Sequence, residues 1–384
     1  MMASMLPGGQ TGMTVGQKLR QINWGLLLLI TVVASVGFAM LYSAAGGQFE
    51  PWATRQMIRF AGGLLLMLLI AVIDLPLVMR YAYVFYAVTF ALLVYVEFAG
   101  EIGMGAQRWI DLKFFQLQPS EVMKIALVVA LARYFHGLGP ANIARPQFLI
   151  GPTLLVIAPA GLVLIQPDLG TATMLVVVGG AMFFAAGVRL WKFAVVAGTG
   201  IAAAPIMWSF LHAYQKDRIL TFLSPERDPL GAGYHILQSK IALGSGGVFG
   251  KGFLQGTQSH LNFLPEHQTD FIFTMLAEEF GMVGGLTLLG LYALLIIYGL
   301  AIALRSRNHF GRLLALGVTI NLFVYVFINT AMVMGLIPVV GIPLPLISYG
   351  GSVMMTVLIG FGLMMMVYIN RDLRIGRRVY DEDA

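Results

Sequence analysis

A carboxylate stands where a polar loop meets an apolar helix. The stretch FLPEHQTDFIFTMLAEEFG, residues 263–281, places Asp270 at this junction and Glu278 two turns further on. A helix that begins near Asp270 puts Thr274 and Glu278 on the same side, because each residue advances about 100°. Lipid tolerates such a polar stripe poorly, so we predict that it faces a cavity or another helix, with Asp270 at the outer mouth. A second interpretation stays open, in which Asp270 and Thr269 cap the helix by accepting backbone N–H groups.

Two opposite charges lie three residues apart in QPSEVMKIALVVALARYF. Glu121 and Lys124 are close enough on one helix face to pair, as expected for charges at membrane depth. We interpret them as a buried structural pair, with contact between Lys124 and an anionic substrate as the alternative. Upstream, GMGAQRWIDL places Arg108 and Trp109 at the expected membrane interface, where Trp is commonly an anchor. Asp168 in QPDLGTA precedes another apolar run and is expected to cap it.

The sequence also excludes several kinds of site. It contains no cysteine, which rules out disulfides, thiol nucleophiles and cysteine metal sites. The stretch GSGGVFGKG differs from a phosphate-binding loop, because Ser245 replaces its first glycine and Gly252 its final Ser or Thr. None of the six histidines belongs to an H-E-x-x-H motif. No motif therefore indicates ATP hydrolysis or a zinc protease.

Apolar helices must position these residues. Of 384 residues, 58% are hydrophobic and 11% charged, which is typical of a membrane protein and not of a soluble enzyme. We predict an all-α, polytopic membrane protein, because ten stretches are long enough to cross about 30 Å of hydrocarbon. These lie near 24–44, 57–75, 80–98, 119–136, 148–165, 170–188, 192–212, 270–303, 312–335 and 350–370.

The distribution of Lys and Arg predicts the orientation. Most basic residues fall in the tails, 1–23 and 371–384, and in the loops on their side of the membrane, so both termini are predicted to be cytoplasmic. The net charge of +6 thus indicates topology, and no nucleic acid partner is expected. The transmembrane domain, 24–370, then has one large extracytoplasmic loop, about 213–269, between helices 7 and 8.

Two parts of the outer face have distinctive patterns. GYHILQSKIALG, within the large loop, favours an amphipathic helix on the membrane surface. PVVGIPLPLISYGGS, before the last helix, is dense in Pro and Gly and favours a rigid, non-helical segment. Irregular backbone at membrane depth is stable only against protein or a water-filled cavity.

Taken together and in order, these motifs resemble the SEDS family of bacterial membrane proteins. The resemblance is carried by NFLPEHQTDFIFTMLAEEFG, RWI, QPSEVMK, QPDLGTA, FLSPERDPLGAGYHILQSKIALGSGGVFGKG and PLPLISYGGS. It spans nearly all of the chain from the first predicted helix on, whereas residues 1–23 match nothing in the pattern. MGLIPVVGIPLPLISYGGS and QSHLNFLPEHQTDFIF are more similar to the family members of cell elongation than to those of division.

The resemblance implies a function and its residues. It implies ten transmembrane helices and peptidoglycan glycosyltransferase activity on lipid II, at the outer face of the bacterial cytoplasmic membrane, in cell elongation and cell-shape maintenance. A class B penicillin-binding protein, the transpeptidase of the elongation complex, is the implied partner. The family's essential aspartate falls on Asp270, its outer-loop tryptophan on Trp109, beside Arg108, and its fourth-helix ion pair on Glu121 and Lys124.

The implied chemistry is an inverting displacement at the anomeric carbon of a lipid-diphosphate-linked sugar. One carboxylate suffices as base for the attacking hydroxyl, and we assign it to Asp270. The departing diphosphate needs cations, for which Arg218, Lys240, Lys251 and Lys124 are candidates. A divalent ion, Mg²⁺ or Mn²⁺, held partly by Asp270 is the alternative, and Glu278 is a supporting candidate.

Two other classes of function stay open. A transporter that flips lipid II also needs a polar groove between helices, although charged residues near the midplane favour transport more than Asp270 at a helix end does. A non-catalytic scaffold of the wall-synthesis complex needs no polar cavity stripe. Both remain alternatives to the glycosyltransferase.

Overall fold

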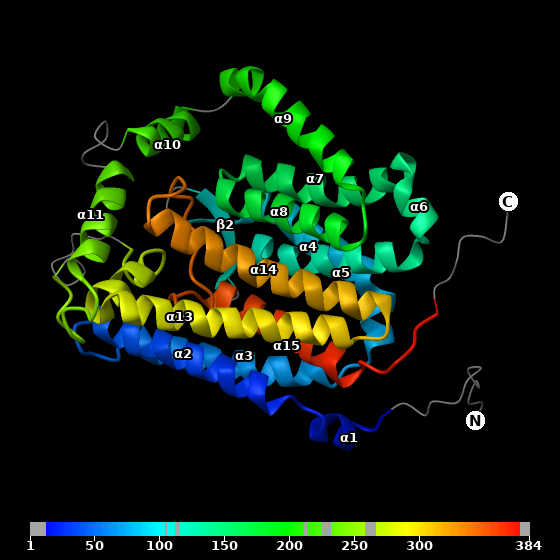
Figure 1. Cartoon of the computed structure of the whole chain (residues 1–384), viewed down its shortest axis with the longest axis horizontal. Helices are drawn as coiled ribbons and strands as arrows, with labels where there is room; N and C mark the ends of the chain where they lie inside the picture. The colour runs from blue at the N-terminus through cyan, green and yellow to red at the C-terminus, as the bar shows by residue number, and fades with distance from the viewer. Residues whose placement is uncertain are drawn as a thin grey trace.

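The computed structural model describes residues 13–103, 106–111, 116–210, 213–224, 232–257 and 266–376. These residues form a bundle of long helices. The first and last described residues lie at the same end of the bundle, and residues 213–224 and 232–257 lie at the other (Figure 1). Chain ends on the same side of the bundle are expected when the chain crosses the membrane an even number of times.

Each of the ten predicted segments contains a helix. They are α2 (Trp24–Ala44), α3 (Ala53–Ala71), α4 (Leu75–Ala99), α5 (Pro119–Gly137), α7 (Ile150–Ile165), α8 (Leu169–Ala185), α9 (Leu190–Phe210), α13 (Ile272–Arg305), α14 (His309–Val333) and α15 (Gly351–Ile369). In the described part of the chain, seven helices are long and apolar enough to cross a membrane, and α8 and the Leu190–Ile206 part of α9 are shorter apolar helices. Helix α5 carries three charged side chains, Glu121, Lys124 and Arg133. The protein is thus an all-α, multi-pass membrane protein.

The predicted tails and loops contain shorter elements. The N-terminal tail holds α1 (Val15–Arg20), which is fixed by an ion pair of 2.6 Å between Lys18 Nζ and Asp74 Oδ1. α6 (Pro140–Ala144) and the 3₁₀ helix η1 (Pro146–Leu149) connect α5 to α7. The large loop holds α10 (Ala213–Leu223) and α11 (Ala232–Ser245). α11 confirms the predicted helix at GYHILQSKIALG, and its place on the membrane surface stays a prediction.

Polar side chains cap the N-termini of several helices. Asn23 accepts a hydrogen bond from the Leu26 amide at 3.1 Å, and Asn308 accepts one from the Gly311 amide at 2.5 Å. Asp168 caps α8 by accepting from the Thr171 amide at 3.0 Å, as its position predicts. These caps satisfy amides that a helix start leaves without a partner.

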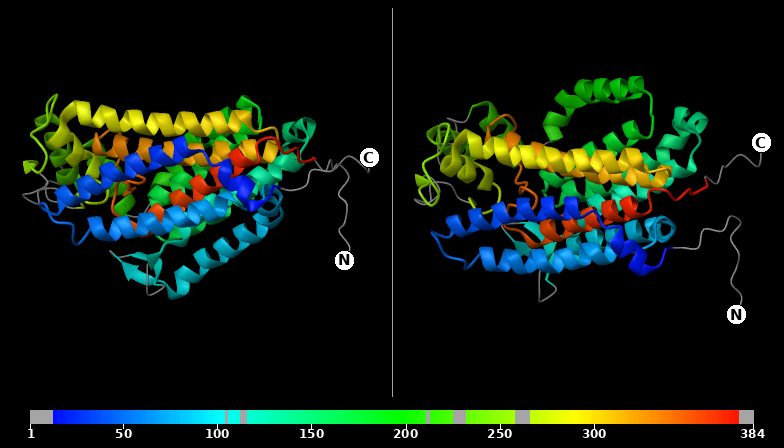
Figure 2. Two further views of the ribbon diagram at one scale, coloured as in Figure 1. Left: turned by 90° about the horizontal axis from the view of Figure 1, so that it is seen from below. Right: turned by 60° about the horizontal axis from the view of Figure 1, so that its bottom comes forward.

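Helices α14 and α15 form the centre of the bundle. α14 packs against α5, α8, α13 and α15, and α15 packs against α3 (Figure 2). α4 lies at the rim against α5 and exposes most of its side chains. α9 leans away from the bundle in both figures, and its apolar side chains, such as Val196 and Ile201, are exposed.

A small sheet joins α4 to α5 and was not predicted. β1 (Glu101–Gly103), β2 (Ala106–Asp111) and β3 (Gln116–Leu117) pair in the order β1-β2-β3, and both pairs are antiparallel. Strands this short show no alternation that a sequence could reveal. The sheet matters for function because β2 carries Arg108 and Trp109.

The segment between α14 and α15, residues 336–349, is non-helical, as its Pro and Gly content predicts. Its side chains Ile342, Leu344 and Ile347 are buried. Side chains of the surrounding helices satisfy its backbone: Gln56 Nε2 donates to the Ser348 carbonyl at 2.9 Å, and the Tyr292 hydroxyl donates to the Pro345 carbonyl. The segment therefore forms a fixed wall at one end of the bundle.

Candidate active site

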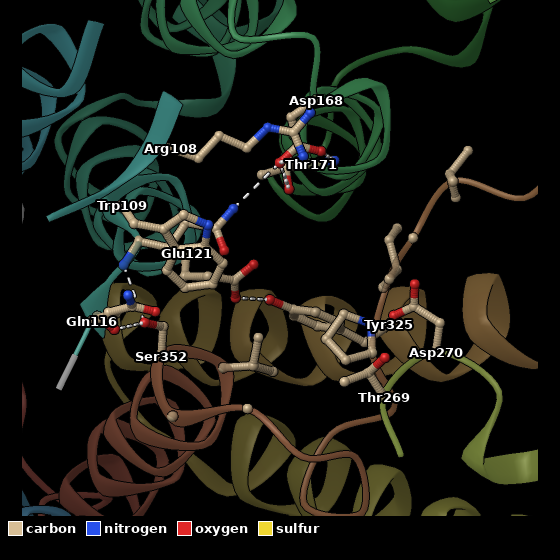
Figure 3. A pocket seen from close by; sticks show the side chains of 18 of the residues that line it. Arg108, Trp109, Gln116, Glu121, Asp168, Thr171, Thr269, Asp270, Tyr325 and Ser352 are labelled. Atoms are coloured by element: carbon tan, nitrogen blue, oxygen red, sulfur yellow. Dashed lines mark hydrogen bonds and ion pairs between the residues drawn. The ribbon is translucent and has the colours of Figure 1, made fainter. Parts of the chain in front are cut away.

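One cavity of about 530 Å³ gathers most of the predicted site residues (Figure 3). Strands β2 and β3, the starts of α5, α8 and α15, and the segments before α13 and α15 contribute to it. Its principal lining residues are Arg108, Trp109, Gln118, Glu121, Lys124, Asp168, Thr171, Glu266, Thr269, Asp270, Tyr325, Tyr349 and Ser352. Five predicted residues thus meet in one place: Arg108, Trp109, Glu121, Lys124 and Asp270.

Asp270 lies in the turn that precedes α13, on the side of the cavity near Tyr325 (Figure 3). The capping interpretation is wrong, because α13 is capped by Phe271 without any side-chain hydrogen bond. Among the described residues, the Asp270 carboxylate has no hydrogen-bond or ion-pair partner. Asp270 precedes the membrane-spanning helix, and burial raises the pKa of its carboxyl from 3.8 to about 7, with smaller contributions from the charges of Glu266 and Asp168.

Glu121 and Lys124 form the predicted pair on α5. Their Oε1 and Nζ atoms are 2.7 Å apart, and the two side chains are 4% and 1% exposed. Tyr325 of α14 donates its hydroxyl to the second carboxylate oxygen, and Lys124 Nζ lies 4.2 Å from the centre of the Tyr325 ring. The pairing is confirmed. Because both residues also line the cavity, contact between Lys124 and substrate stays a prediction.

Arg108 holds the turn between α7 and α8. Its Nε donates to the Gln166 carbonyl at 2.9 Å, and its Nη2 donates to the Pro167 carbonyl at 2.6 Å. The third nitrogen, Nη1, lies 3.9 Å from Asp168 Oδ2. That carboxylate also accepts from the Thr171 hydroxyl at 2.9 Å and from Gln118 Nε2 at 3.3 Å. A partly exposed guanidinium is therefore oriented on the cavity wall by two carbonyls.

Trp109 lies beside Arg108 on β2, across the view from Asp270 in Figure 3. Ser352, at the start of α15, links this side of the cavity to the bundle. It donates to the Gln116 carbonyl at 2.5 Å and accepts from the Gln118 amide at 3.1 Å. The tryptophan that the sequence places at the membrane interface thus also forms part of the cavity wall.

Glu278 and Lys251 do not line the cavity, which corrects the prediction for both. Glu278 is fully buried and accepts from Lys251 Nζ at 2.6 Å and from the Thr257 amide at 2.9 Å. The predicted stripe fails because α13 begins at Ile272, so helical phase does not extend back to Asp270. Thr274 instead shares a hydrogen bond of 2.8 Å with Ser239 of α11.

Of the other two cation candidates, Lys240 is not among the residues that line the cavity, and the structure does not describe the Arg218 side chain. Lys240 projects from α11 against Gly335, where a Cβ atom on Gly335 would come within 2.8 Å of Lys240 Nζ. This location is the C-terminal end of α14, whose dipole favours a cation. Arg218 belongs to α10, and its side chain is outside the described residues.

Asp270 is also predicted to be one ligand of a divalent ion. In the described part of the chain, no three His, Cys, Asp or Glu residues are grouped so that they could hold a metal ion. Mg²⁺ commonly takes one or two carboxylates and completes its shell with water and substrate phosphate. The metal assignment to Asp270 therefore stays a prediction, and no step below uses it.

The sequence reasoning missed Tyr325 and Asn329. Together with Asn321 they lie at i, i+4 and i+8 on α14, and all three are buried in an otherwise apolar segment. Polar side chains at this spacing within a membrane helix indicate a face turned toward other protein. That signal was present in the sequence.

Comparison with known proteins agrees with the geometry. The family model for the FtsW, RodA and SpoVE cell cycle proteins matches residues 18–373. This chain belongs to that family. Peptidoglycan glycosyltransferase MrdB of Escherichia coli (strain K12) is 46% identical over 348 residues, which are 90% of this chain and 93% of the relative. Peptidoglycan glycosyltransferase RodA of Treponema pallidum (strain Nichols) is 32% identical, over 90% of this chain and 97% of the relative.

Solved structures that are 30% or more identical to this chain have the same fold. One, reported for the structural coordination of polymerization and crosslinking by a peptidoglycan synthase complex, superposes with a TM-score of 0.78 at 33% identity and covers 91% of this chain and 98% of that one. The rod shape determining protein RodA of Thermus thermophilus superposes with a TM-score of 0.70 at 30% identity, over 92% and 98%. The family resemblance of the motifs is thereby confirmed.

Proposed function

We propose that the cavity polymerises lipid II into glycan strands and that Asp270 is its general base. The enzyme is a glycosyltransferase, since curated relatives over nine-tenths of the chain are named peptidoglycan glycosyltransferases. The observation that carries the residue assignment is the environment of Asp270. It is the one described cavity carboxylate without a protein partner, and its pKa is raised to about 7. A base with a pKa near the working pH is the most effective.

The reaction transfers one proton and exchanges one bond. The 4-hydroxyl of one lipid-linked disaccharide attacks the anomeric carbon of another and gives its proton to Asp270. The new carbon–oxygen bond forms as the bond from that carbon to the diphosphate breaks, and the lipid diphosphate leaves with the electron pair. Attack opposite the leaving group inverts the α linkage of the donor to β, so a single base is sufficient.

Arg108 is the cation that we assign to the departing diphosphate. Its Nε and Nη2 are fixed by carbonyls, so that Nη1 is held at the cavity wall. Lys124 also lines the cavity, but Glu121 lies only 2.7 Å from it, whereas Arg108 Nη1 is 3.9 Å from Asp168 Oδ2. A preorganised donor needs no reorganisation as charge develops on the leaving group.

The cavity is proposed to face the outside of the cytoplasmic membrane, with both termini inside. This orientation rests on the excess of Lys and Arg near the termini. A class B penicillin-binding protein is the proposed partner, within the elongation complex. Support comes from the similar chain solved in a synthase complex that coordinates polymerization with crosslinking.

The decisive experiment compares the purified wild-type protein with Asp270→Asn, each with and without its penicillin-binding partner, for glycan strands made from lipid II. Since Asn cannot take the proton, we expect polymerisation to fall by about a hundredfold or more. Asp270→Glu is expected to be nearly as poor, because misplacement by about 1 Å can cost 10²-fold.

Both variants should be inserted in the membrane and retain partner binding, which serves as the folding control. Near-normal polymerisation by a folded Asn variant would remove Asp270 from the mechanism. A wild-type protein that flips lipid II between leaflets and makes no strands would indicate the transporter. A wild-type protein that does neither, while its partner complex needs it, would indicate the scaffold.

A further inference from the structure

The turn that carries Asp270 is held by α14 and the segment that follows it, and not by its own helix. Three successive carbonyls, those of Gln268, Thr269 and Asp270, each accept a hydrogen bond from residues 329–349. The Tyr349 amide donates to Gln268 at 2.9 Å, and the Ser348 hydroxyl donates to Thr269 at 2.6 Å. The third bond, to Asp270 itself, comes from Asn329.

Asn329 is fully buried on α14 and uses its amide group twice. Its Nδ2 donates to the Asp270 carbonyl at 2.9 Å and to the Ile342 carbonyl at 2.7 Å. The first contact fixes the backbone of the candidate base, and the second fixes the non-helical wall of the cavity. Val340, Gly341 and Ile342 of that wall line the cavity together with Asp270.

The two bonds have a geometric consequence. A Cβ atom placed on Gly341 would lie 3.4 Å from Asp270 Oδ2, so the carboxylate and the wall are already adjacent. A primary amide suits this position, because its two N–H groups diverge from a single nitrogen and can reach two carbonyls at once. Of the residues that the structure describes, Asn329 alone donates a side-chain hydrogen bond to the Asp270 backbone.

We propose that Asn329 is a positioning residue for the reaction, an inference that rests on the proposed role of Asp270. It does not touch the reacting atoms. It sets the distance between the Asp270 carboxylate and the 336–349 wall, and so the place at which the acceptor hydroxyl meets the base. Loss of its donors should therefore lower the rate of the chemical step more than the affinity for lipid II.

Asn321 provides a matched control on the same helix. It is also a buried asparagine of α14, 3% exposed against 0% for Asn329, and in both residues Oδ1 is buried and has no partner in the described part of the chain. No described hydrogen bond joins Asn321 to the turn at 266–270 or to the wall. Replacement by Leu removes the amide at either site with little change of volume.

The experiment measures lipid II polymerisation by Asn329→Leu and Asn321→Leu, each also combined with Asp270→Asn. We expect Asn329→Leu to lower kcat by about tenfold or more with KM within about threefold, and Asn321→Leu to stay within about twofold of the wild type. In the Asp270→Asn background, Asn329→Leu should add less than about twofold, because both changes disable the same group. Asn329→Ser, which keeps one hydroxyl donor, should lie between the wild type and Asn329→Leu.

The outcomes separate this inference from the proposed function. A folded Asn329→Leu protein with wild-type kcat, or a loss that multiplies with that of Asp270→Asn, overturns the positioning role and leaves Asp270 as the base. Near-normal activity of Asp270→Asn overturns the proposed function itself. If both the Leu and the Ser variants fail to fold while Asn321→Leu folds, Asn329 is a structural residue and the inference is wrong.

Discussion

At the scale of single residues, the cavity carboxylates differ in what they contact. Glu121 is paired with Lys124, Asp168 accepts from Thr171, and Glu266 accepts from the Thr269 hydroxyl at 3.1 Å. Asp270 has no such partner in the part of the chain that the structure describes. A carboxylate without donors is not stabilised in its charged form, and this is consistent with its raised pKa.

The raised pKa predicts how the rate depends on pH. Only the ionised form of Asp270 can accept a proton, and a pKa of about 7 means that this form is lost as the pH falls through 7. We therefore expect polymerisation to rise with pH to a plateau, with a midpoint near 7 instead of near 4. Initial rates at saturating lipid II between pH 5 and 9 provide the measurement.

A matched pair of variants checks the cause of that midpoint. Glu266→Gln removes a negative charge that raises the pKa of Asp270, so the midpoint should move to lower pH. Glu50→Gln alters an exposed carboxylate between α2 and α3, and should leave the midpoint in place. An unchanged midpoint in Glu266→Gln would show that another group controls the pH profile.

At the scale of elements, the ion pair on α5 predicts which of two variants is the less stable. Lys124→Ala leaves the buried Glu121 charged, whereas Glu121→Gln with Lys124→Ala removes both charges. If the pair is structural, the single variant should be less stable than the double variant, since stranding a buried charge costs about 3–5 kcal/mol. Membrane yield and thermal unfolding in detergent measure the stability.

Polymerisation by the double variant then tests the second role of Lys124. A folded double variant that retains activity assigns Lys124 to structure. A folded but inactive double variant would indicate that Lys124 contacts the diphosphate. Measuring yield and rate separately keeps the two roles apart.

The kink in α13 predicts that a substitution at Gly281 lowers the stability of the protein. Gly281 interrupts the helix with φ of +68°, and a Cβ there would lie 2.4 Å from the Gly250 nitrogen. This close approach lets the Gly247 carbonyl accept from the Met282 amide at 2.9 Å, which attaches the glycine-rich segment after α11 to α13. We expect Gly281→Ala to lower the thermal midpoint, with about 1–3 kcal/mol from this backbone conformation alone, which is essentially restricted to glycine.

Gly290→Ala is the control for that prediction. Gly290 lies on the same helix, and a Cβ there would have no atom within 4 Å. Because Ala is the better helix former, the control should leave stability unchanged or raise it by about 0.5–1 kcal/mol. Equal effects of the two substitutions would contradict the account of the kink.

At the scale of the whole molecule, the orientation can be tested because the chain contains no cysteine. Gln255 is exposed in the segment that follows α11, and Arg307 is exposed between α13 and α14, where its amide donates to the Arg371 carbonyl near the last described residues. A cysteine at Gln255 should react with an impermeant thiol reagent in intact spheroplasts, and one at Arg307 should react only after lysis. The reverse pattern would invert the proposed topology.

The sequence by itself determined the class of the molecule and the location of its helices. Apolar runs of membrane-spanning length have few alternatives to a helix, because every backbone polar group must be satisfied within the bilayer. Because unpaired charges at membrane depth are costly, the Glu121–Lys124 pair could be predicted from its spacing, and Pro and Gly content predicted the non-helical segment that the structure places at 336–349. Asp168 as a cap follows from its place directly before an apolar run.

Only the tertiary structure decided which polar residues meet. Lys251 and Glu278 pair with each other outside the cavity. Asp270 lies in the turn before α13, although the sequence pattern predicts that it belongs to that helix. Arg108 joins Asp168 across a turn, and Asn329 joins Asp270 to Ile342, through contacts between residues 13 to 60 positions apart. Periodicity fixes which residues share a face of one helix, but it does not fix which faces of different helices are brought together. Packing among α5, α8, α14 and the non-helical wall supplies that information, and it is what makes these residues a site.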